Sequence, residues 1–171
     1  MSQTPRVTLR PAVPEDAATL VELIGDLAEY ERLSDECHAD PAELAAHLFG
    51  PRPYAEVFVA EVDGTAAGFA LFFHNYSTFL TKPGIYLEDL FVRPAFRGLG
   101  IGKALLSRLA ALAVERGCGR LEWSVLKWNS PAIGFYLRLG AVPMEEWQVY
   151  RLAGDPLERL GRGAAPGGDR S

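Results

Sequence analysis

The sequence of 171 residues has little cysteine and no long apolar run. Its two cysteines, Cys37 and Cys118, lie 81 positions apart without a Cys-x-x-Cys pair. This spacing excludes a disulfide scaffold and favours a reducing, cytoplasmic compartment. No apolar run approaches the roughly 20 residues that cross a bilayer, so we expect no membrane span and no membrane partner. The first ten residues also lack the basic and then apolar layout of a secretory signal.

Basic residues are too few and too scattered for a nucleic-acid-binding protein. The chain has 17 lysines and arginines against 22 aspartates and glutamates, and it has no basic stripe that could follow a phosphate backbone. The charge is uneven, because residues 1–85 carry 13 acids and 5 bases whereas residues 86–171 carry 9 acids and 12 bases. The first part could attract cations and the second could hold an anion, although chance alone can produce this asymmetry in a solvated surface.

Repeats are absent as well, which excludes solenoids and propellers. The 49% apolar content is enough for a single core. Apolar residues at helical spacing and capping residues predict helices over about 15–32, 41–49, 101–116 and 130–139. Apolar runs and an Asp-Gly turn predict strands over about 7–10, 57–61, 65–73, 85–92, 120–126 and 141–152.

This order of elements predicts an α/β (α+β) fold with a mixed sheet. A hairpin comes first, and single strands then alternate with helices. We expect one domain over residues 1–153. Residues 154–171 are rich in Gly, Pro and Arg, and we predict that they form a disordered tail.

The most informative stretch is a glycine-rich turn between a predicted strand and a helix. Gly98, Gly100 and Gly102 lack Cβ atoms, so a ligand can approach the backbone closely there. The first amides of the following helix have no acceptor within the helix, and with the helix dipole they suit a phosphate. Arg97 and Lys103 add positive charge at either end. A turn that only tightens the helix start is the alternative.

Two common phosphate-binding motifs do not fit this turn. A Walker A loop needs four residues between its glycines and Ser or Thr after its Lys, but three residues separate Gly98 from Gly102 and Ala104 follows Lys103. A dinucleotide fingerprint needs Gly-x-Gly-x-x-Gly. Its last position falls on Lys103 or on Leu105, depending on the first glycine.

The turn resembles the GNAT acetyltransferase family. Arg97–Gly102 matches that family's Arg/Gln-x-x-Gly-x-Gly/Ala signature, and Asn129–Tyr136 resembles its Asn-x-x-Ala-x-x-x-Tyr stretch. Residues 27–31, 86–92 and 128–136 are most similar to the spermidine/spermine (diamine) and thialysine N-acetyltransferases. The resemblance implies a GNAT fold with about six to seven strands and about four helices, acetyl-CoA as co-substrate, and a homodimer with C-terminal strands in its interface.

The resemblance also implies which residues hold acetyl-CoA. The backbone of the strand end would hold the acetyl group and the pantetheine arm, and the amides of the turn would hold the pyrophosphate. Two residues of the next helix would contact the cofactor arm. These cofactor-binding candidates are Leu90, Phe91, Val92, Arg97, Gly98, Leu99, Gly100, Ile101, Gly102, Lys103, Asn129 and Ala132.

Acetyl transfer to an amine needs a base for the amine, a donor for the oxyanion and an acid for the thiolate. No Ser/His/Asp set stands in plausible positions, so we expect direct attack in a ternary complex. Tyr136 is the candidate acid for the sulfur of CoA, with a core tyrosine as its alternative. Glu88 is the candidate for amine binding and deprotonation. Strict alternation predicts that Glu88 and Asp89 face opposite sides of the strand, with Asp89 as a structural carboxylate.

The predicted amine site combines acids with aromatic rings, a pairing that suits a cationic chain. The resemblance places Tyr30, Glu31 and Glu146 there beside Glu88. Residues 77–84 lack the tryptophan expected of the polyamine enzymes, which leaves a shorter diamine or a lysine-like amine equally open.

The sequence therefore predicts an acetyl-CoA-dependent N-acetyltransferase that acts on a small cationic amine. Acetylation of a protein or peptide amino group, and a non-catalytic acyl-CoA-binding module, are the alternatives. We expect no metal, because Cys37-His38 has no second pair at ligand spacing.

Overall fold

The computed structural model describes residues 4–163, and its contacts divide the chain into two compact units, Met1–Ser124 and Val125–Ser171. In the described part, the first unit holds the β-sheet with helices α1 (Ala17–Tyr30), α2 (Pro41–Phe49) and α3 (Ile101–Glu115). The second unit holds α4 (Ser130–Arg138) and α5 (Gly154–Gly161).

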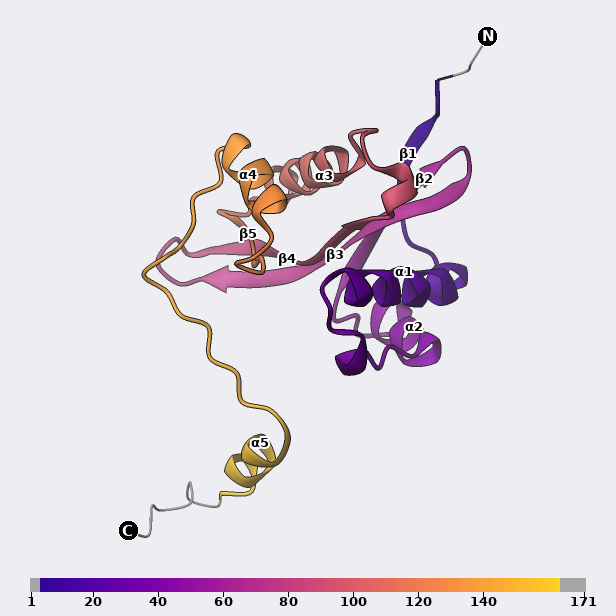
Figure 1. The fold of residues 1–171 in the computed structure, drawn as a ribbon. Helices are drawn as coiled ribbons and strands as arrows, with labels where there is room; N and C mark the ends of the chain where they lie inside the picture. The colour runs from indigo at the N-terminus through magenta and orange to yellow at the C-terminus, as the bar shows by residue number, and fades with distance from the viewer. Residues whose placement is uncertain (1–3, 164–171) are drawn as a thin grey trace. The chain divides into compact units, whose positions relative to one another are not determined.

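The sheet of the first unit has five strands in the order β1-β2-β3-β4-β5 (Figure 1). Neighbouring strands are antiparallel from β1 to β4, and β5 pairs parallel with β4. This mixed sheet confirms the predicted α/β class. The strands are β1 Val7–Pro11, β2 Glu56–Val62, β3 Thr65–Ser77, β4 Lys82–Val92 and β5 Leu121–Trp123.

The turn between β2 and β3 follows from two residues. Asp63 and Gly64 both have positive φ, 50° and 82°, the left-handed conformation that a two-residue hairpin turn requires. Val62 pairs directly with Thr65 across this turn. The Asp-Gly turn predicted from the sequence is therefore confirmed.

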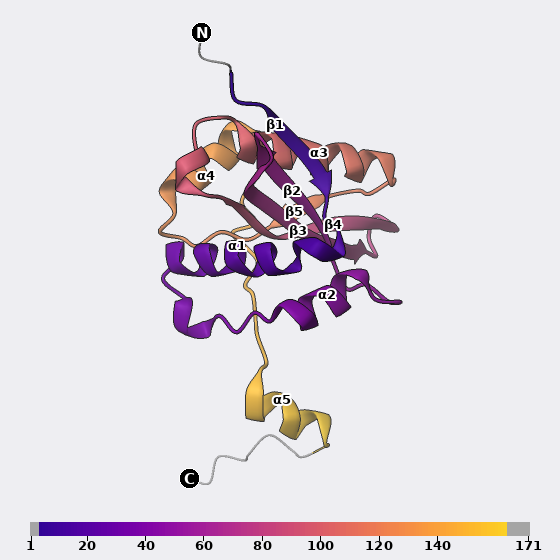
Figure 2. The ribbon, with the colours of Figure 1, turned by 90° about the vertical axis from the view of Figure 1, so that its right-hand side faces the viewer.

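Helices cover both faces of the sheet in the first unit. Helices α1 and α2 lie on one face and α3 on the other (Figures 1 and 2). The Asp40 side chain caps α2 by accepting a hydrogen bond from the Glu43 amide at 2.8 Å, as its position before Pro41 predicts. The core on the α1 side is made of Leu20, Leu23, Leu27, Leu48, Val57, Val59, Phe69 and Phe91.

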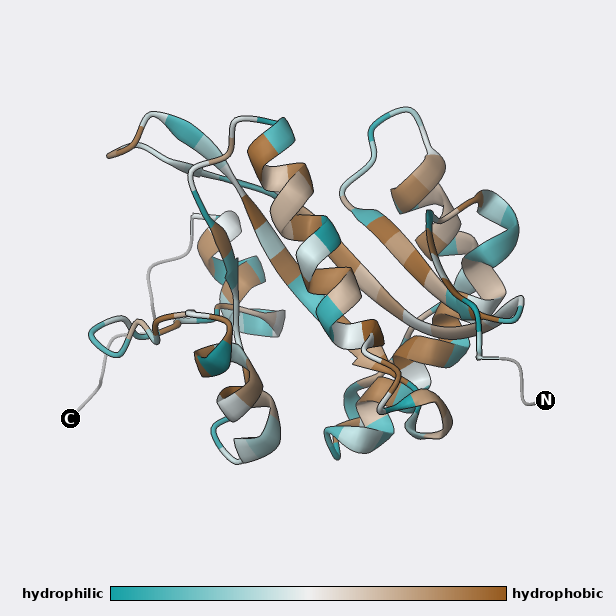
Figure 3. Ribbon diagram, turned by 90° about the horizontal axis from the view of Figure 1, so that it is seen from above, coloured by the Kyte–Doolittle hydropathy of each residue, from teal (hydrophilic) through white to brown (hydrophobic). Residues whose placement is uncertain are grey.

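Helix α3 packs through one apolar stripe. Ile101, Leu105 and Leu109 are buried, at a spacing of four residues, and brown and teal residues alternate along this helix in Figure 3. Such an amphipathic pattern fixes which side of a helix meets a sheet. Because Ile101 is the first residue of α3, the core also fixes where the glycine-rich turn ends.

Strands β3 and β4 approach closely at Gly68. A Cβ atom there would lie 2.4 Å from the carbonyl oxygen of Phe91 and 3.2 Å from the Cα of Val92. Real side chains do not tolerate such a distance, so Gly68 allows β3 to support the last residues of β4. These residues lead into the glycine-rich turn.

The structure departs from the predicted elements in the sheet. It has five strands rather than six to seven, because the part of the chain that is described forms no strand over 141–152. A strand needs a neighbour for its backbone groups, and a lone extended segment does not form one. The long hairpin of β3 and β4 also extends beyond the predicted 65–73 and 85–92, because Asn75, Pro83 and Gly84 suggest a loop when they are considered without their pairing.

The C-terminal tail also differs from the prediction. Helix α5 occupies Gly154–Gly161, where the composition predicts disorder. Leu157 and Leu160 lie three residues apart among charged residues, an amphipathic spacing that a composition argument overlooks. The rest of the predicted disordered tail, 164–171, lies outside the described residues.

Candidate active site

The pairing of β4 with β5 ends before β4 does, while β4 stays paired with β3 on its other side. The two strands pair only from Ile85↔Leu121 to Leu87↔Trp123, whereas β4 extends to Val92. The Arg93 amide donates to the Ala67 carbonyl at 2.8 Å. Because backbone groups alternate along an antiparallel strand, those of Leu90 and Val92 point away from β3, toward this open edge. The open edge is the stretch where the resemblance predicts acetyl and pantetheine binding.

A β-bulge at Glu88 changes the facing of the side chains around it. Leu71 pairs with Asp89 and Phe72 pairs with Leu87, so Glu88 is an extra residue on β4. The prediction that Glu88 and Asp89 face opposite sides by strict alternation therefore has no basis in this strand. Asp89 reaches a cavity beside α1, and Glu88 is exposed.

The glycine-rich turn has the conformation that its sequence predicts. Gly98 and Gly100 have φ of 84° and 77°, and a Cβ atom at Gly98, Gly100 or Gly102 would meet no atom within 4 Å. The turn joins α3 through the Ala104 amide, which donates to the Gly100 carbonyl at 2.9 Å. The amides before Ala104 belong to the helix end that normally lacks acceptors. The backbone is accessible here, and the side chain of Ile101 is in the core.

Arg97 joins residues that the sequence assigns to two different sites. Its Nε donates to the Val92 carbonyl at 3.2 Å, and its guanidinium carbon lies 4.9 Å from the centre of the Tyr30 ring. The Tyr30 ring is also 6.5 Å from the Phe91 ring. Tyr30 is a predicted amine-site residue, whereas the other three are predicted cofactor residues. No local sequence pattern predicts this contact, because Tyr30 and Arg97 are far apart in the chain.

An acidic cavity lies next to these residues. It has a volume of about 190 Å³, and three carboxylates line it together with a thiol and apolar side chains. Glu31 is the predicted member of this set, Asp89 is predicted as a structural carboxylate, and no sequence pattern indicates Glu36 or Cys37. Their meeting depends on how the loop after α1 folds back, which no local pattern shows. The lining residues are Ile24, Leu27, Ala28, Glu31, Leu33, Glu36, Cys37 and Asp89.

Asp89 is the carboxyl group of this cavity whose pKa is raised most clearly. Burial, together with the nearby charges of Glu88 and Glu31, raises the pKa of Asp89 from 3.8 to about 6. Burial also raises the pKa of Glu31. A cation that enters such a cavity stabilises the ionised form of these acids, because it offsets their mutual repulsion.

Two acids of α1, Glu22 and Asp26, already have a basic partner. Arg93, at the end of β4, lies 2.8 Å from Asp26 and 3.7 Å from Glu22, and its guanidinium also donates to the Ala66 carbonyl at 3.3 Å. These contacts tie the middle of α1 to β4. Glu22 and Asp26 therefore have a structural role, whereas Glu31, directly after α1, lines the acidic cavity.

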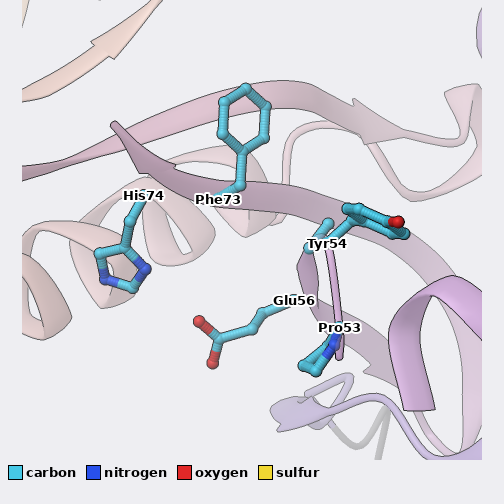
Figure 4. Close-up of a pocket in the computed structure, with 6 residues that line it drawn as sticks. Pro53, Tyr54, Glu56, Phe73 and His74 are labelled. Carbon is cyan, nitrogen blue, oxygen red and sulfur yellow. The ribbon is translucent and has the colours of Figure 1, made fainter. Parts of the chain in front are cut away.

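A larger cavity, of about 370 Å³, lies elsewhere in the first unit (Figure 4). Glu56 and His74 extend toward the same side, and Phe73 points to the other side of β3 (Figure 4). Arg116 forms two hydrogen bonds to the Glu56 carboxylate, at 2.6 and 2.8 Å, and keeps the pKa of Glu56 below its ordinary value. Because this acid is already neutralised by an internal cation, the smaller acidic cavity is the better candidate for an amine site.

The remaining predicted residues lie in the second unit. Asn129 caps α4 by accepting a hydrogen bond from the Ala132 amide at 3.4 Å. Tyr136 is half-buried two turns further along the same helix, with its ring 5.5 Å from that of Phe135. Glu146 is exposed between α4 and α5, next to Trp147. The predicted helix start and the helical setting of Tyr136 are thus confirmed, and the chemical roles of these residues stay predictions.

Neither a metal cluster nor a membrane-spanning helix is found among the described residues. Within 4–163, no three His, Cys, Asp or Glu side chains come close enough to hold an ion. No helix in the same range is both long and apolar enough to cross a membrane.

Comparison with known proteins identifies the family. A model of the acetyltransferase (GNAT) family matches residues 21–141. An L-ornithine N5-acetyltransferase of Arabidopsis thaliana is 34% identical, and the match covers 89% of this chain and 86% of that protein. A thialysine N-epsilon-acetyltransferase of Bos taurus is 35% identical, with 90% and 96% covered. The chain therefore belongs to the GNAT acetyltransferase family and is an N-acetyltransferase.

A solved structure has a similar fold. An integron cassette protein from the mobile metagenome of V. cholerae superimposes with a TM-score of 0.78 at 28% identity, covering 91% of this chain and 98% of that one. The resemblance seen in the sequence, including its likeness to the thialysine acetyltransferases, is confirmed.

The raised pKa of Asp89 predicts that Asp89→Asn increases the free energy of unfolding by an amount that depends on pH. At pH 8 the buried carboxylate is ionised at a cost, so the variant should be more stable than the wild type by up to about 3 kcal/mol. As pH falls through about 6 toward 3.8, the native carboxyl takes up its proton and this cost disappears, so the difference should fall to about half by pH 5.

Urea unfolding of both proteins at pH 8 and pH 5 measures this difference. Asp35→Asn is the control. Asp35 is exposed in the loop after α1, so this substitution should change the free energy of unfolding little at either pH. A variant that is less stable than the wild type at pH 8, or a difference that does not shrink at pH 5, would contradict the claim that ionised Asp89 destabilises the fold.

Proposed function

We propose that this protein transfers the acetyl group of acetyl-CoA to a primary amine of a small cationic substrate. The observation that carries this proposal is the position of β4. Its open edge leads into a glycine-rich turn at a helix N-terminus, and its other side contributes Asp89 to an acidic cavity. One strand thus borders a surface suited to an anionic donor and a cavity suited to a cationic acceptor.

The residues of the first unit fit acetyl-CoA. The turn offers accessible backbone with positive φ at Gly98 and Gly100, and Arg97 and Lys103 supply positive charge for phosphates. The backbone groups of Leu90 and Val92 on the open edge supply hydrogen bonds for an extended amide arm. When bound, acetyl-CoA supplies the activated thioester. The Leu90 amide is our candidate donor to the carbonyl oxygen, whose negative charge grows during attack.

Two side chains carry the proton transfers in this proposal. The substrate must lose a proton to expose its nitrogen lone pair, and the exposed Glu88 at the bulge takes that proton through water. The nitrogen then forms a bond to the acetyl carbon while the bond from carbon to sulfur breaks, and Tyr136 gives a proton to the departing sulfur. The nitrogen loses its second proton as the amide forms, and this proton restores that of Tyr136. No covalent enzyme intermediate is needed.

The acidic cavity supports an acceptor with a second positive charge. Glu31, Glu36 and Asp89 gather in about 190 Å³ beside Tyr30, which suits a short cationic chain. The relatives are named for ornithine and thialysine, both of which carry an amine at the end of a short side chain. We therefore propose a basic amino acid or a short diamine as substrate.

A panel of amines tests this function. We expect release of CoA with ornithine, thialysine, lysine or putrescine, and kcat/KM should exceed that of a monoamine of equal length by at least about tenfold, because a second ammonium pairs with the cavity acids. Spermidine and a peptide with a free N-terminus complete the panel. Turnover with the peptide and with none of the small amines would refute the proposal. Tight binding of acetyl-CoA without any transfer would indicate a binding module instead.

Substitution of the proposed acid and base should slow the reaction without loss of the cofactor. We expect Tyr136→Phe and Glu88→Gln each to lower kcat by about 100-fold or more, the range of general acid and base catalysis, with acetyl-CoA affinity almost unchanged. Tyr54→Phe is the control, since Tyr54 is 75% exposed beside the other cavity and belongs to neither the proposed active site nor the proposed dimer interface. Near-normal turnover of either variant would remove that residue from its role.

We also propose that the protein forms a homodimer through the segment 141–152. This segment exposes apolar side chains within its unit, including Val142, Trp147, Val149 and Tyr150 at 77%, 77%, 82% and 86%. A stretch that the sequence predicts as a strand and that lacks a ladder of its own is typical of one that pairs with another chain.

Sedimentation velocity tests the homodimer. We expect the wild type to sediment with the mass of two chains and Trp147→Asp to shift it to one chain, because a buried interface does not tolerate a new charge. Val114→Asp is the matched control, as Val114 is 80% exposed on α3 and should leave the dimer intact. A wild type that is monomeric at micromolar concentration would contradict the proposal.

A further inference from the structure

The contact between Arg97 and Tyr30 links the two halves of the proposed site. The guanidinium carbon of Arg97 lies 4.9 Å from the centre of the Tyr30 ring, well within the range of a cation–π contact. Its Nε also donates to the Val92 carbonyl at 3.2 Å. Arg97 thus covers an aromatic face and occupies an acceptor on the open edge of β4.

The aromatic face of Tyr30 is a natural place for a substrate ammonium. Tyr30 ends α1 and is 37% exposed, and the next residue, Glu31, lines the acidic cavity together with Asp89. Cations bind aromatic faces, and nearby carboxylates strengthen that attraction. The protein's own guanidinium therefore lies where the positive charge of an acceptor would bind.

Arg97 also borders the surface suited to phosphate. It directly precedes Gly98, and Gly100 is the N-cap of α3, where amides and the helix dipole favour an anion. The Arg97 side chain is exposed, so it can change partners at little cost in packing. A guanidinium binds phosphate with two parallel hydrogen bonds, which are stronger than its contact with an exposed ring.

We propose that Arg97 couples the cofactor site to the amine site by exchanging one partner for another. Without a phosphate, Arg97 stacks on Tyr30 and closes its face to a cationic acceptor. With a phosphate at the N-terminus of α3, Arg97 turns to it, and both the Tyr30 ring and the Val92 carbonyl become accessible. This inference rests on the proposed function, since it needs a phosphate-bearing donor and a cationic acceptor.

The exchange has a thermodynamic consequence. CoA should increase the affinity for the amine, and the amine should increase the affinity for CoA by the same factor, because coupling between two sites is reciprocal. The factor is set by the cation–π contact that Arg97 gives up, which corresponds to about 2- to 5-fold in Kd for an exposed pair.

Calorimetric titration of ornithine measures this coupling without catalysis. In the wild type, saturating CoA should tighten ornithine binding about 2- to 5-fold. In Arg97→Gln, ornithine should bind the free protein as tightly as it binds the wild type with CoA, and CoA should add nothing further. Arg108→Gln is the matched control, because Arg108 lies over the Phe58 ring at 5.1 Å elsewhere on α3 and should leave the coupling unchanged.

Two further variants separate partner exchange from simple repulsion between positive charges. Lys103→Gln removes a positive charge from the same turn, where no ring contact is found in the described structure, and should leave the coupling in place. In a Tyr30→Leu background, Arg97→Gln should give no gain in ornithine affinity, because the face for which both cations compete is gone. A gain of equal size in that background, or in Lys103→Gln, would overturn the inference in favour of charge repulsion.

The remaining outcomes distinguish this inference from the proposed function. Coupling that persists in Arg97→Gln would overturn the inference alone, provided that the wild type binds CoA and acetylates the amine. Absence of any coupling in the wild type would do the same. A wild type that binds neither CoA nor any amine of the panel would overturn both.

Discussion

The interruption of regular pairing along β4 is the constraint on which the candidate site depends. An extra residue at Glu88 opposes β3, and on the other edge β5 pairs only as far as Leu87. In a regular strand, Glu88 and Asp89 would face opposite sides of the sheet. If β5 paired along the whole of β4, the backbone groups of this edge would be hydrogen-bonded within the sheet. The bulge brings Asp89 to the α1 side, and the parting of β4 from β5 exposes backbone groups that a substrate can use. Gly68 supports this region, since no larger residue would let β3 approach β4 so closely.

Charge is distributed along this strand in a way that matches a reaction between an anionic donor and a cationic acceptor. The turn after β4 presents amides and positive side chains. The cavity beside it presents acids, among which burial and, to a lesser extent, the charges of Glu88 and Glu31 raise the pKa of Asp89. Arg97 stands between them, with Val92 on one side and Tyr30 on the other. The uneven charge of the sequence thus has a partial explanation, but not all of the acids serve the site, because Arg93 holds Asp26 and Glu22 of α1.

Much of the fold was predictable because its signals are local. The Asp63-Gly64 turn, the Asp40 cap and the stripe of Ile101, Leu105 and Leu109 depend on residues within a few positions of one another. The strand predicted over 141–152 failed because a strand needs a partner, and its unit supplies none. The family was also readable from the sequence, since both of its motifs are short and continuous. The meeting of Asp89, Glu36 and Cys37 was not predictable, because it depends on how a loop after α1 returns to β4.

The sequence by itself determined the class of this protein and indicated the part of the candidate site that we propose for the donor. The glycines of the turn impose their conformation wherever they stand, and a helix start gathers amides in every fold. Only the tertiary structure brought together the residues that we propose for the acceptor. The bulge at Glu88 depends on pairing with β3, and the raised pKa of Asp89 depends first on burial. The contact of Arg97 with Tyr30 joins two segments that are distant in the chain. Register, burial and long-range contact are properties of the packed chain, so no local pattern contains them.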